Sequence, residues 1–520
     1  MSAAPLLHLS ASTSSVRSTS PLRAIRRLRL ITSHLSSTAS TPSLSPWTLT
    51  SQGPVPLSRL GSKQFSTSST QRNGPPSNDS RSPFTFTTAC SFRGKPGSPI
   101  YVKPGSTPSS SSSKDQPPND NDPKDRRSNG GKRRNNSSGG GFGHLKQGLS
   151  QDHPLSKWRD EQLEKSPNGA GHDWFFVQGV PNNGVGEKEE VQKKEEGEEK
   201  EQVTIGGIKG VVLGVADGVG GWEESGVDPS HFSQALMWFA RERVRTGQFE
   251  LERGGKGLKT LLEGAFEDVT NEKQILAGSS TACLVALDSA TGKLHSANLG
   301  DSSFLILRPQ PLSPRQEPTP PSSPDTPTSS LPSSPDTPPP SPSYKVLHSE
   351  PCQTHFFNAP YQLSKLPPSS NRSSENSLMD LPSDAATTPK EGIQLKSGDV
   401  VVLSTDGFGD NVFGEEVEQL LQLVHQKCLE TQTQQQQQQQ GGGGEEAVEK
   451  VDEHLFSSSL AQTSLNFSRL VMFKKDKVTP FEVEARRYGY GKESGLGGGK
   501  IDDVTVLVAV VGGGPGGGGN

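Results

Sequence analysis

The chain has 520 residues, enough for several domains, but only 29% of them are hydrophobic, and it carries 57 Gly and 42 Pro. This composition excludes a chain that is globular throughout and predicts long disordered segments. The formal net charge of −4 excludes a generally basic, nucleic-acid-binding character. The four cysteines include no Cys-x-x-Cys pair and indicate neither a disulfide framework nor a zinc site. No stretch approaches the about 20 apolar residues of a membrane span.

The N-terminal segment has an unusual charge pattern. Its first 78 residues contain no Asp or Glu, whereas Arg and Lys are spread among Ser, Thr and Leu. This pattern is typical of a mitochondrial transit peptide, and an ordinary Ser/Thr-rich disordered tail is the alternative. We therefore expect residues 1–80 to be a transit peptide or disordered, and the protein to lie in the mitochondrion, in the matrix.

Apolar periodicity predicts one α+β domain over residues 82–511, followed by a Gly-rich tail at 512–520. Low-complexity composition predicts solvated insertions within it, at 97–165, 182–202, 309–343, 366–390 and 434–444. Strands are expected at 83–92, 173–177, 211–216, 280–287, 294–299, 302–307, 400–403 and 504–510. Helices are expected from 229 to near 247, at 258–273 and from about 415 onward. The strands between 280 and 307 suggest an antiparallel meander, with Asp301 in its last tight turn.

Three acidic turns lie at the ends of apolar strands. Asp217 and Gly218 follow one strand, Asp406 follows a second, and Asp502 precedes a third. If the last strand is antiparallel to the other two, these three carboxylates share one rim of the sheet. Asp-Gly is also the commonest hairpin signal, so each turn alone is more simply only a turn. Clustered carboxylates repel one another unless a cation binds them, and all-oxygen sites suit Mg²⁺ or Mn²⁺.

Five short motifs occur at predicted strand ends, and in their order they resemble the metal-dependent type 2C (PPM) serine/threonine phosphatases. Two further segments, 226–230 and 357–363, look like the mitochondrial branch of that family. Each motif is weak alone, but five in order over roughly half the chain make a specific signal. The motifs are VADGVGGW at 215–222, GSSTAC at 278–283, ANLGDS at 297–302, STDGFGDN at 404–411 and DDVTVL at 502–507.

The resemblance implies a PPM-type β-sandwich of two antiparallel sheets flanked by helices (α-β-β-α). It also implies hydrolysis of phosphoserine and phosphothreonine by a metal-activated water at a binuclear Mg²⁺ or Mn²⁺ centre. By the same resemblance, Asp217 bridges the two metals, the Gly218 carbonyl binds one of them, and Asp406 and Asp502 bind the other. The partners would be phosphoprotein substrates, including mitochondrial ones, and we expect a monomer.

The family pattern suggests further roles that the residues themselves leave open. Asp173 is the candidate for orienting metal-bound water, and Asp410 and Asp503 are outer candidates near the ligands. Asp301 is either a turn residue or the ligand of a third, weaker metal. His172, beside Asp173, is either a proton relay or a partly exposed loop residue.

The sequence also departs from the family pattern. Val219 stands where many members carry the His that acts as the acid, although the mitochondrial branch shares this absence. The phosphate-binding Arg found in many members has no clear counterpart here. Two other functions stay open: a non-catalytic PPM-like regulator and a small-molecule phosphate-ester hydrolase.

Overall fold

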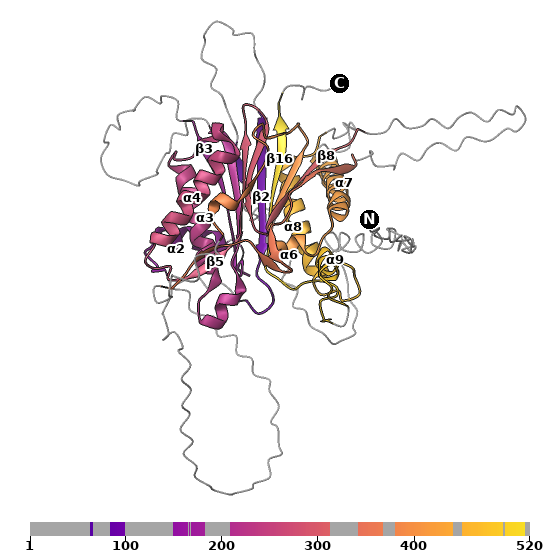
Figure 1. Ribbon diagram of the computed structural model, residues 1–520. Helices are drawn as coiled ribbons and strands as arrows, with labels where there is room; N and C mark the ends of the chain where they lie inside the picture. The colour runs from indigo at the N-terminus through magenta and orange to yellow at the C-terminus, as the bar shows by residue number, and fades with distance from the viewer. Residues whose placement is uncertain are drawn as a thin grey trace, which may run out of the picture. The chain divides into compact units, whose positions relative to one another are not determined.

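The computed structural model describes residues 63–65, 84–98, 149–164, 166, 168–182, 208–311, 342–367, 380–439, 450–491 and 494–514. The segment Leu60–Asn520 forms one compact unit that contains all of them. Two antiparallel sheets lie face to face in this unit, and helices cover both outer faces (Figure 1). The sequence-based prediction of an α+β sandwich flanked by helices is therefore confirmed.

The first sheet runs in the order β1-β2-β16-β15-β8-β9, and every neighbouring pair is antiparallel. Its strands combine segments from both ends of the domain, since β2 pairs with β16 along its whole length. The strands are β1 (Lys63–Phe65), β2 (Phe84–Arg93), β8 (Ser303–Pro309), β9 (Tyr344–Ser349), β15 (Val400–Ser404) and β16 (Val504–Gly513).

The second sheet runs in the order β13-β7-β6-β4-β3, with β14 beside β7. It contains β3 (Asp173–Pro181), β4 (Ile208–Asp217), β6 (Ala282–Asp288), β7 (Lys293–Leu299), β13 (Ala386–Thr387) and β14 (Ile393–Gln394). Two small pairs complete the strands: β5 (Gly278–Ser280) with β12 (Leu363–Lys365), and β10 (Thr354–Phe356) with β11 (Ala359–Pro360).

Helices α3 and α4 pack on the second sheet, and α7 and α8 pack on the first (Figure 1). The helices are α2 (Pro154–Leu163), α3 (Pro229–Arg245), α4 (Gly255–Asn271), α6 (Asp406–Gly409), α7 (Gly414–Gln439), α8 (Glu453–Val471) and α9 (Pro480–Arg487). Short 3₁₀ turns are η2 (Gly220–Ser225), η3 (Leu251–Arg253) and η4 (Pro382–Asp384). None of the helices in the described ranges is long and apolar enough to cross a membrane.

Strand β16 shows why its sequence is apolar at every position. Side chains alternate across a strand, so Val506 and Val508 face α7 and α8, while Leu507 and Ala509 face the second sheet. A central strand covered on both faces therefore needs an unbroken apolar run. Strand β15 is packed on both faces in the same way. Its end is therefore held rigidly, and so are the side chains that follow it.

Helix α3 begins where the sequence predicts. The Asp228 carboxylate accepts a hydrogen bond from Ser230 N at 2.9 Å, and Pro229 occupies the first turn, where it sacrifices no hydrogen bond. Phe232 and Leu236 are fully buried against the second sheet. The chain leaves the helix through Gly247, whose φ of 76° is easily adopted only by glycine.

The predicted meander between 280 and 307 is wrong in its last step. Strands β6 and β7 pair as expected, but β8 belongs to the other sheet, so the chain crosses between the sheets at Gly300-Asp301. Both sheets bury apolar residues on two faces, and alternation alone does not reveal which sheet a strand joins.

Three predicted boundaries also need correction. The insertion at 97–165 ends in helix α2, because Leu155, Trp158 and Leu163 are buried in the core. The insertion at 366–390 ends in ordered structure, with Ala385 buried and β13 paired with β7. In the insertion predicted at 434–444, residues 434–439 continue helix α7.

Within the N-terminal segment predicted at 1–80, Lys63–Phe65 form β1, which pairs with the open edge of β2. The rest of that segment, residues 1–62 and 66–80, lies outside the described residues, as do most of the other predicted insertions.

Candidate metal centre

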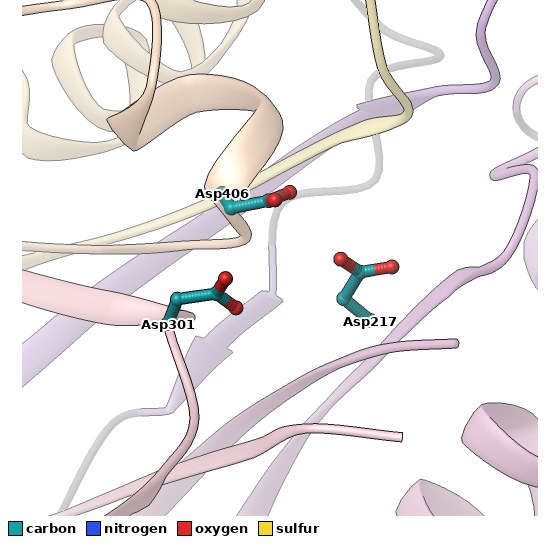
Figure 2. Close-up of side chains that lie close together, drawn as sticks. All are labelled: Asp217, Asp301 and Asp406. Carbon is teal, nitrogen blue, oxygen red and sulfur yellow. The ribbon is translucent and has the colours of Figure 1, made fainter. Parts of the chain in front are cut away.

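Three carboxylates meet where the two sheets approach each other. Asp217, Asp301 and Asp406 each offer an oxygen, and these atoms lie within 4.8 Å of one another. They come from the end of β4, the second residue before β8 and the first residue of α6. Figure 2 shows the three carboxylates turned toward a common space. The structure thus brings together two of the predicted ligands and the residue that was left open between turn and metal ligand.

The rim is shared because β15 and β16 are antiparallel. Ser404 near the end of β15 pairs with Val506 near the start of β16, so the turns carrying Asp406 and Asp502 lie side by side. Strand β4, which carries Asp217, is in the opposite sheet and lies against β15. The predicted convergence therefore occurs between two sheets, whereas the sequence argument placed it on one.

Asp301 reaches this rim because the chain changes sheets just before it. Gly300 has a φ of +110°, and a Cβ there would lie 2.7 Å from the carbonyl oxygen of Tyr361. Glycine is therefore required at the crossing. The crossing positions the Asp301 carboxylate beside Asp406, which a simple hairpin turn within one sheet would not do.

Lys500 is a member of the centre that the sequence reasoning missed. Its Nζ atom lies 2.9 Å from Asp410 Oδ2 and 3.1 Å from Asp502 Oδ2, and it also contacts the carboxylate of Asp406. Burial alone would lower the pKa of Lys500, but these carboxylates raise it well above its ordinary value. The only signal was a basic residue two positions before Asp502, which an argument confined to carboxylates overlooked.

The backbone of Lys500 is fixed by one side chain. Asn411 Nδ2 donates to the Lys500 carbonyl oxygen at 2.9 Å, and Lys500 N donates to Asn411 Oδ1 at 3.0 Å. Asn411 is fully buried just after α6. The helix that begins with Asp406 therefore also determines the position of Lys500.

Asp173 lies beside Asp217 and is 1% exposed. Its Oδ2 accepts a hydrogen bond from Thr405 Oγ1 at 2.7 Å, while its Oδ1 has no hydrogen-bond partner among the described residues. Burial raises the pKa of Asp173 well above its ordinary value, and the carboxylate of Asp503 raises it further. This position, adjacent to the cluster, is compatible with its predicted outer role.

Asp503 acts mainly as a clamp on the backbone around the centre. Its carboxylate accepts hydrogen bonds from Lys95 N at 2.6 Å and from His172 N at 2.9 Å. The His172 ring lies between two carboxylates, with Nε2 2.9 Å from Glu223 Oε1 and Nδ1 3.8 Å from Asp503 Oδ2. These contacts join the loops after β2 and before β3 to the start of β16.

The backbone N–H groups of Asp217 and Gly218 hold their turn in place by hydrogen bonds to neighbouring segments. Asp217 N donates to Thr281 Oγ1 at 3.0 Å, and Gly218 N donates to the carbonyl oxygen of His172 at 3.2 Å. A Cβ at Gly218 would lie 2.7 Å from the carbonyl oxygen of Pro229, so no larger residue fits. The close packing explains why a glycine follows Asp217.

The charge balance of the cluster favours a bound cation. Burial raises the pKa of Asp217 and Asp301 well above their ordinary values, and the Asp406 carboxylate is the next cause for both. Burial also raises the pKa of Asp410 to about 6, although Lys500 opposes the shift. Asp301 Oδ1 and Asp406 Oδ1 are buried without a hydrogen-bond partner in the described part of the chain. Unpartnered, all-carboxylate oxygens fit hard divalent ions such as Mg²⁺ or Mn²⁺.

A cavity of about 660 Å³ opens from this cluster. Asp301, Asp406 and Asp410 line one end of it, and its walls come from β8, β9, α6, the start of α7, α9 and the β10–β11 hairpin. A substrate lying in this cavity would therefore border directly on the carboxylates.

Comparisons with known proteins identify the family. No protein-family model matches the chain. Among solved structures, the photosystem II phosphatase PBCP is 21% identical, covers 68% of this chain and 94% of its own, and has a TM-score of 0.39. The catalytic domain of the serine/threonine phosphatase PstP, solved with two manganese ions, is 13% identical, covers 65% and 98%, and has a TM-score of 0.29.

Curated relatives are more similar in sequence. The protein phosphatase PTC7 homolog of Xenopus laevis is 32% identical over 300 residues, which is 58% of this chain and 76% of the relative. The PTC7 homolog fig of Drosophila grimshawi is 32% identical over 355 residues, covering 68% and 83%. The human PTC7 homolog is 31% identical over 300 residues, covering 58% and 75%. The chain therefore belongs to the PPM (PP2C) family of protein serine/threonine phosphatases, in the branch of the PTC7 homologues.

Proposed function

We propose that this phosphatase hydrolyses phosphoserine and phosphothreonine at a binuclear Mg²⁺ or Mn²⁺ centre. Asp217 and the Gly218 carbonyl would hold one ion, and Asp217, Asp406 and Asp502 the other. Asp301 would hold a third, weaker ion. The observation that carries the proposal is the convergence of Asp217, Asp301 and Asp406 within 4.8 Å, with Oδ1 of Asp301 and of Asp406 buried without a partner among the described residues.

When bound, the two ions would supply the positive charge that activates a water and neutralises the phosphoryl oxygens. The protein residues have separate tasks. Asp173, held by Thr405 Oγ1, would orient that water from the buried side of the cluster. Lys500 neutralises part of the carboxylate charge, because its ammonium contacts Asp406, Asp410 and Asp502. The rigid strand ends keep these groups in position, so little reorganisation is needed during the reaction.

Substituting the ligands tests the centre. Asp217→Ala and Asp406→Asn should each abolish Mn²⁺-dependent hydrolysis of a phosphoserine peptide while circular dichroism shows a folded protein. Asp288→Asn, at the last residue of β6, where the carboxylate accepts a hydrogen bond from Ala290 N, is the matched control and should keep wild-type activity. Near-normal turnover in either ligand variant would refute the centre.

The same assay separates the other two functions. A non-catalytic regulator would hydrolyse no substrate with either metal, and a small-molecule hydrolase would favour sugar phosphates over phosphopeptides. We propose protein substrates because the PTC7 relatives are protein phosphatases.

We also propose that the protein acts in the mitochondrial matrix. The support is the sequence alone, since residues 1–78 carry Arg and Lys without a single acidic residue. A fluorescent protein fused behind residues 1–80 should enter mitochondria. The same fusion with Arg23, Arg26, Arg27 and Arg29 changed to Glu should stay outside, and equal import of both would contradict the proposal.

A further inference from the structure

The cavity beside the metal centre has a distinctive charge pattern. Beyond the carboxylates of the centre itself, the described residues in its walls include four glutamates and one basic residue. The glutamates are Glu350, Glu415, Glu418 and Glu484, and the basic residue is Arg487. The region next to the phosphate-binding end is therefore acidic.

Arg487 does not neutralise this wall. It lies 2.9 Å from Glu484 and its side chain is 72% exposed, so it compensates one carboxylate at the edge of the cavity. Glu418 binds Val346 N at 2.9 Å and Lys345 Nζ at 2.8 Å.

The other two glutamates leave negative charge in the wall. Among the described residues, the Glu350 carboxylate pairs with a histidine, His348, at 3.0 Å and with no Lys or Arg. Glu415, itself exposed in the first turn of α7, makes no ion pair within the described part of the chain, although its charge contributes to raising the pKa of Lys345 after the larger effect of Glu418. Glu415 is therefore a carboxylate available to a ligand.

The remaining walls are apolar and partly aromatic. Phe357 from the β10–β11 turn, Phe413 before α7 and Phe481 on α9 line the same cavity, as do Leu305 and Val346. Apolar walls accept the methylene stem of a long basic side chain, while carboxylates bind its charged end. Aromatic faces add a favourable interaction with a cation.

We propose that this cavity binds Arg or Lys side chains that flank the phosphorylated residue, so the enzyme selects phosphoproteins with basic residues near the scissile phosphate. The inference rests on the proposed function, because it assumes that the phosphoryl group lies at the Asp301–Asp406 end of the cavity. An acidic flanking sequence would place like charges against Glu350 and Glu415, and apolar walls would not compensate them.

One phosphoserine peptide, made with Arg, Gln or Glu at the positions flanking the phosphoserine, tests this inference with the full chain and Mn²⁺. At low salt, kcat/KM for the Arg version should exceed that for the Glu version by about tenfold, mostly through KM. The ratio should shrink as salt is raised, because part of the wall is exposed to solvent. The ratio of the two kcat/KM values does not depend on the fraction of active enzyme, so different preparations can be compared.

Glu415→Lys should bring the Arg/Glu ratio close to one, and Glu415→Gln should give an intermediate ratio. Glu263→Lys, on the exposed face of α4, is the matched charge reversal and should keep the wild-type ratio. Hydrolysis of all three peptides with equal kcat/KM would overturn the inference but leave the proposed function standing. The same Arg/Glu ratio in wild type and in Glu415→Lys would also overturn the inference and leave the proposed function standing. If no peptide is hydrolysed, the proposed function fails and the inference fails with it.

Discussion

Asp173 and Asp217 stand directly opposite each other at the same end of β3 and β4. Cross-strand neighbours of like charge destabilise a sheet, and burial raises the pKa of both carboxyl groups. The repulsion between these two carboxylates therefore destabilises this end of the sheet, and a bound divalent cation would offset that repulsion. Such arrangements are typical of sites where binding supplies part of the folding energy.

Asp173→Asn should therefore stabilise the protein in EDTA and weaken its Mn²⁺ affinity. The asparagine oxygen can still accept the hydrogen bond from Thr405, so the change removes mainly the charge. We expect a higher melting temperature in EDTA and a loss of about 10- to 100-fold in metal affinity or activity. Thermal denaturation and calorimetric Mn²⁺ titration measure both. A lower melting temperature in EDTA would contradict the electrostatic argument.

Lys500→Met should bind Mn²⁺ more tightly than the wild type. The ammonium contacts the carboxylates of Asp406, Asp410 and Asp502, and one positive charge within a few ångströms disfavours the entry of another. We expect the dissociation constant to fall by about tenfold or more. Lys477→Met is the control, since Lys477 pairs with Glu416 outside the centre. Unchanged or weaker Mn²⁺ binding in Lys500→Met would show that the ammonium and the metal do not compete.

The sequence predicts the acidic rim because each of its turns is local. Asp217 and Asp406 each follow an apolar strand directly, so the position of the strand end determines that of the carboxylate. Their convergence also required β4 to pack against β15 of the opposite sheet, which the local pattern does not reveal. Lys500 and Asp301 were harder to place, because their roles depend on long-range packing. Asp301 joins the centre only through the crossing between sheets at Gly300.

A helix that follows low-complexity sequence and several very short strands also escaped prediction. Helix α2 has ten residues, and its buried positions, Leu155, Trp158 and Leu163, follow a long polar segment that dilutes the periodic signal. Strands β10, β11, β13 and β14 have two or three residues each, too few to show alternation. Tertiary contacts, such as the pairing of β13 with β7, decide these conformations.

Arg308→Met should destabilise the domain by about 2–3 kcal/mol. Arg308 binds the fully buried Asp399 with two hydrogen bonds, of 2.8 and 2.7 Å, and its removal leaves that carboxylate with Lys396 N as its one hydrogen-bond donor among the described residues. Arg245→Met is the control, because Arg245 is 53% exposed and its pair with Glu242 contributes less than about 1 kcal/mol. Urea denaturation measures both, and equal losses would contradict the role of burial.

His295→Gln should reduce the loss of stability at acid pH. The His295 ring is buried against Gly254 and Gly392, its Nδ1 has no hydrogen-bond partner among the described residues, and burial lowers its pKa below 6.5. Between the lowered pKa and the ordinary one the unfolded state binds more protons, so stability decreases as the pH falls through this window. Urea denaturation in EDTA at about pH 7.5 and about pH 5.5 should show a smaller decrease for the variant. Because the metal-centre carboxylates titrate alike in both proteins, the difference isolates the histidine. Equal decreases in the two proteins would mean that His295 takes up its proton without cost to the fold.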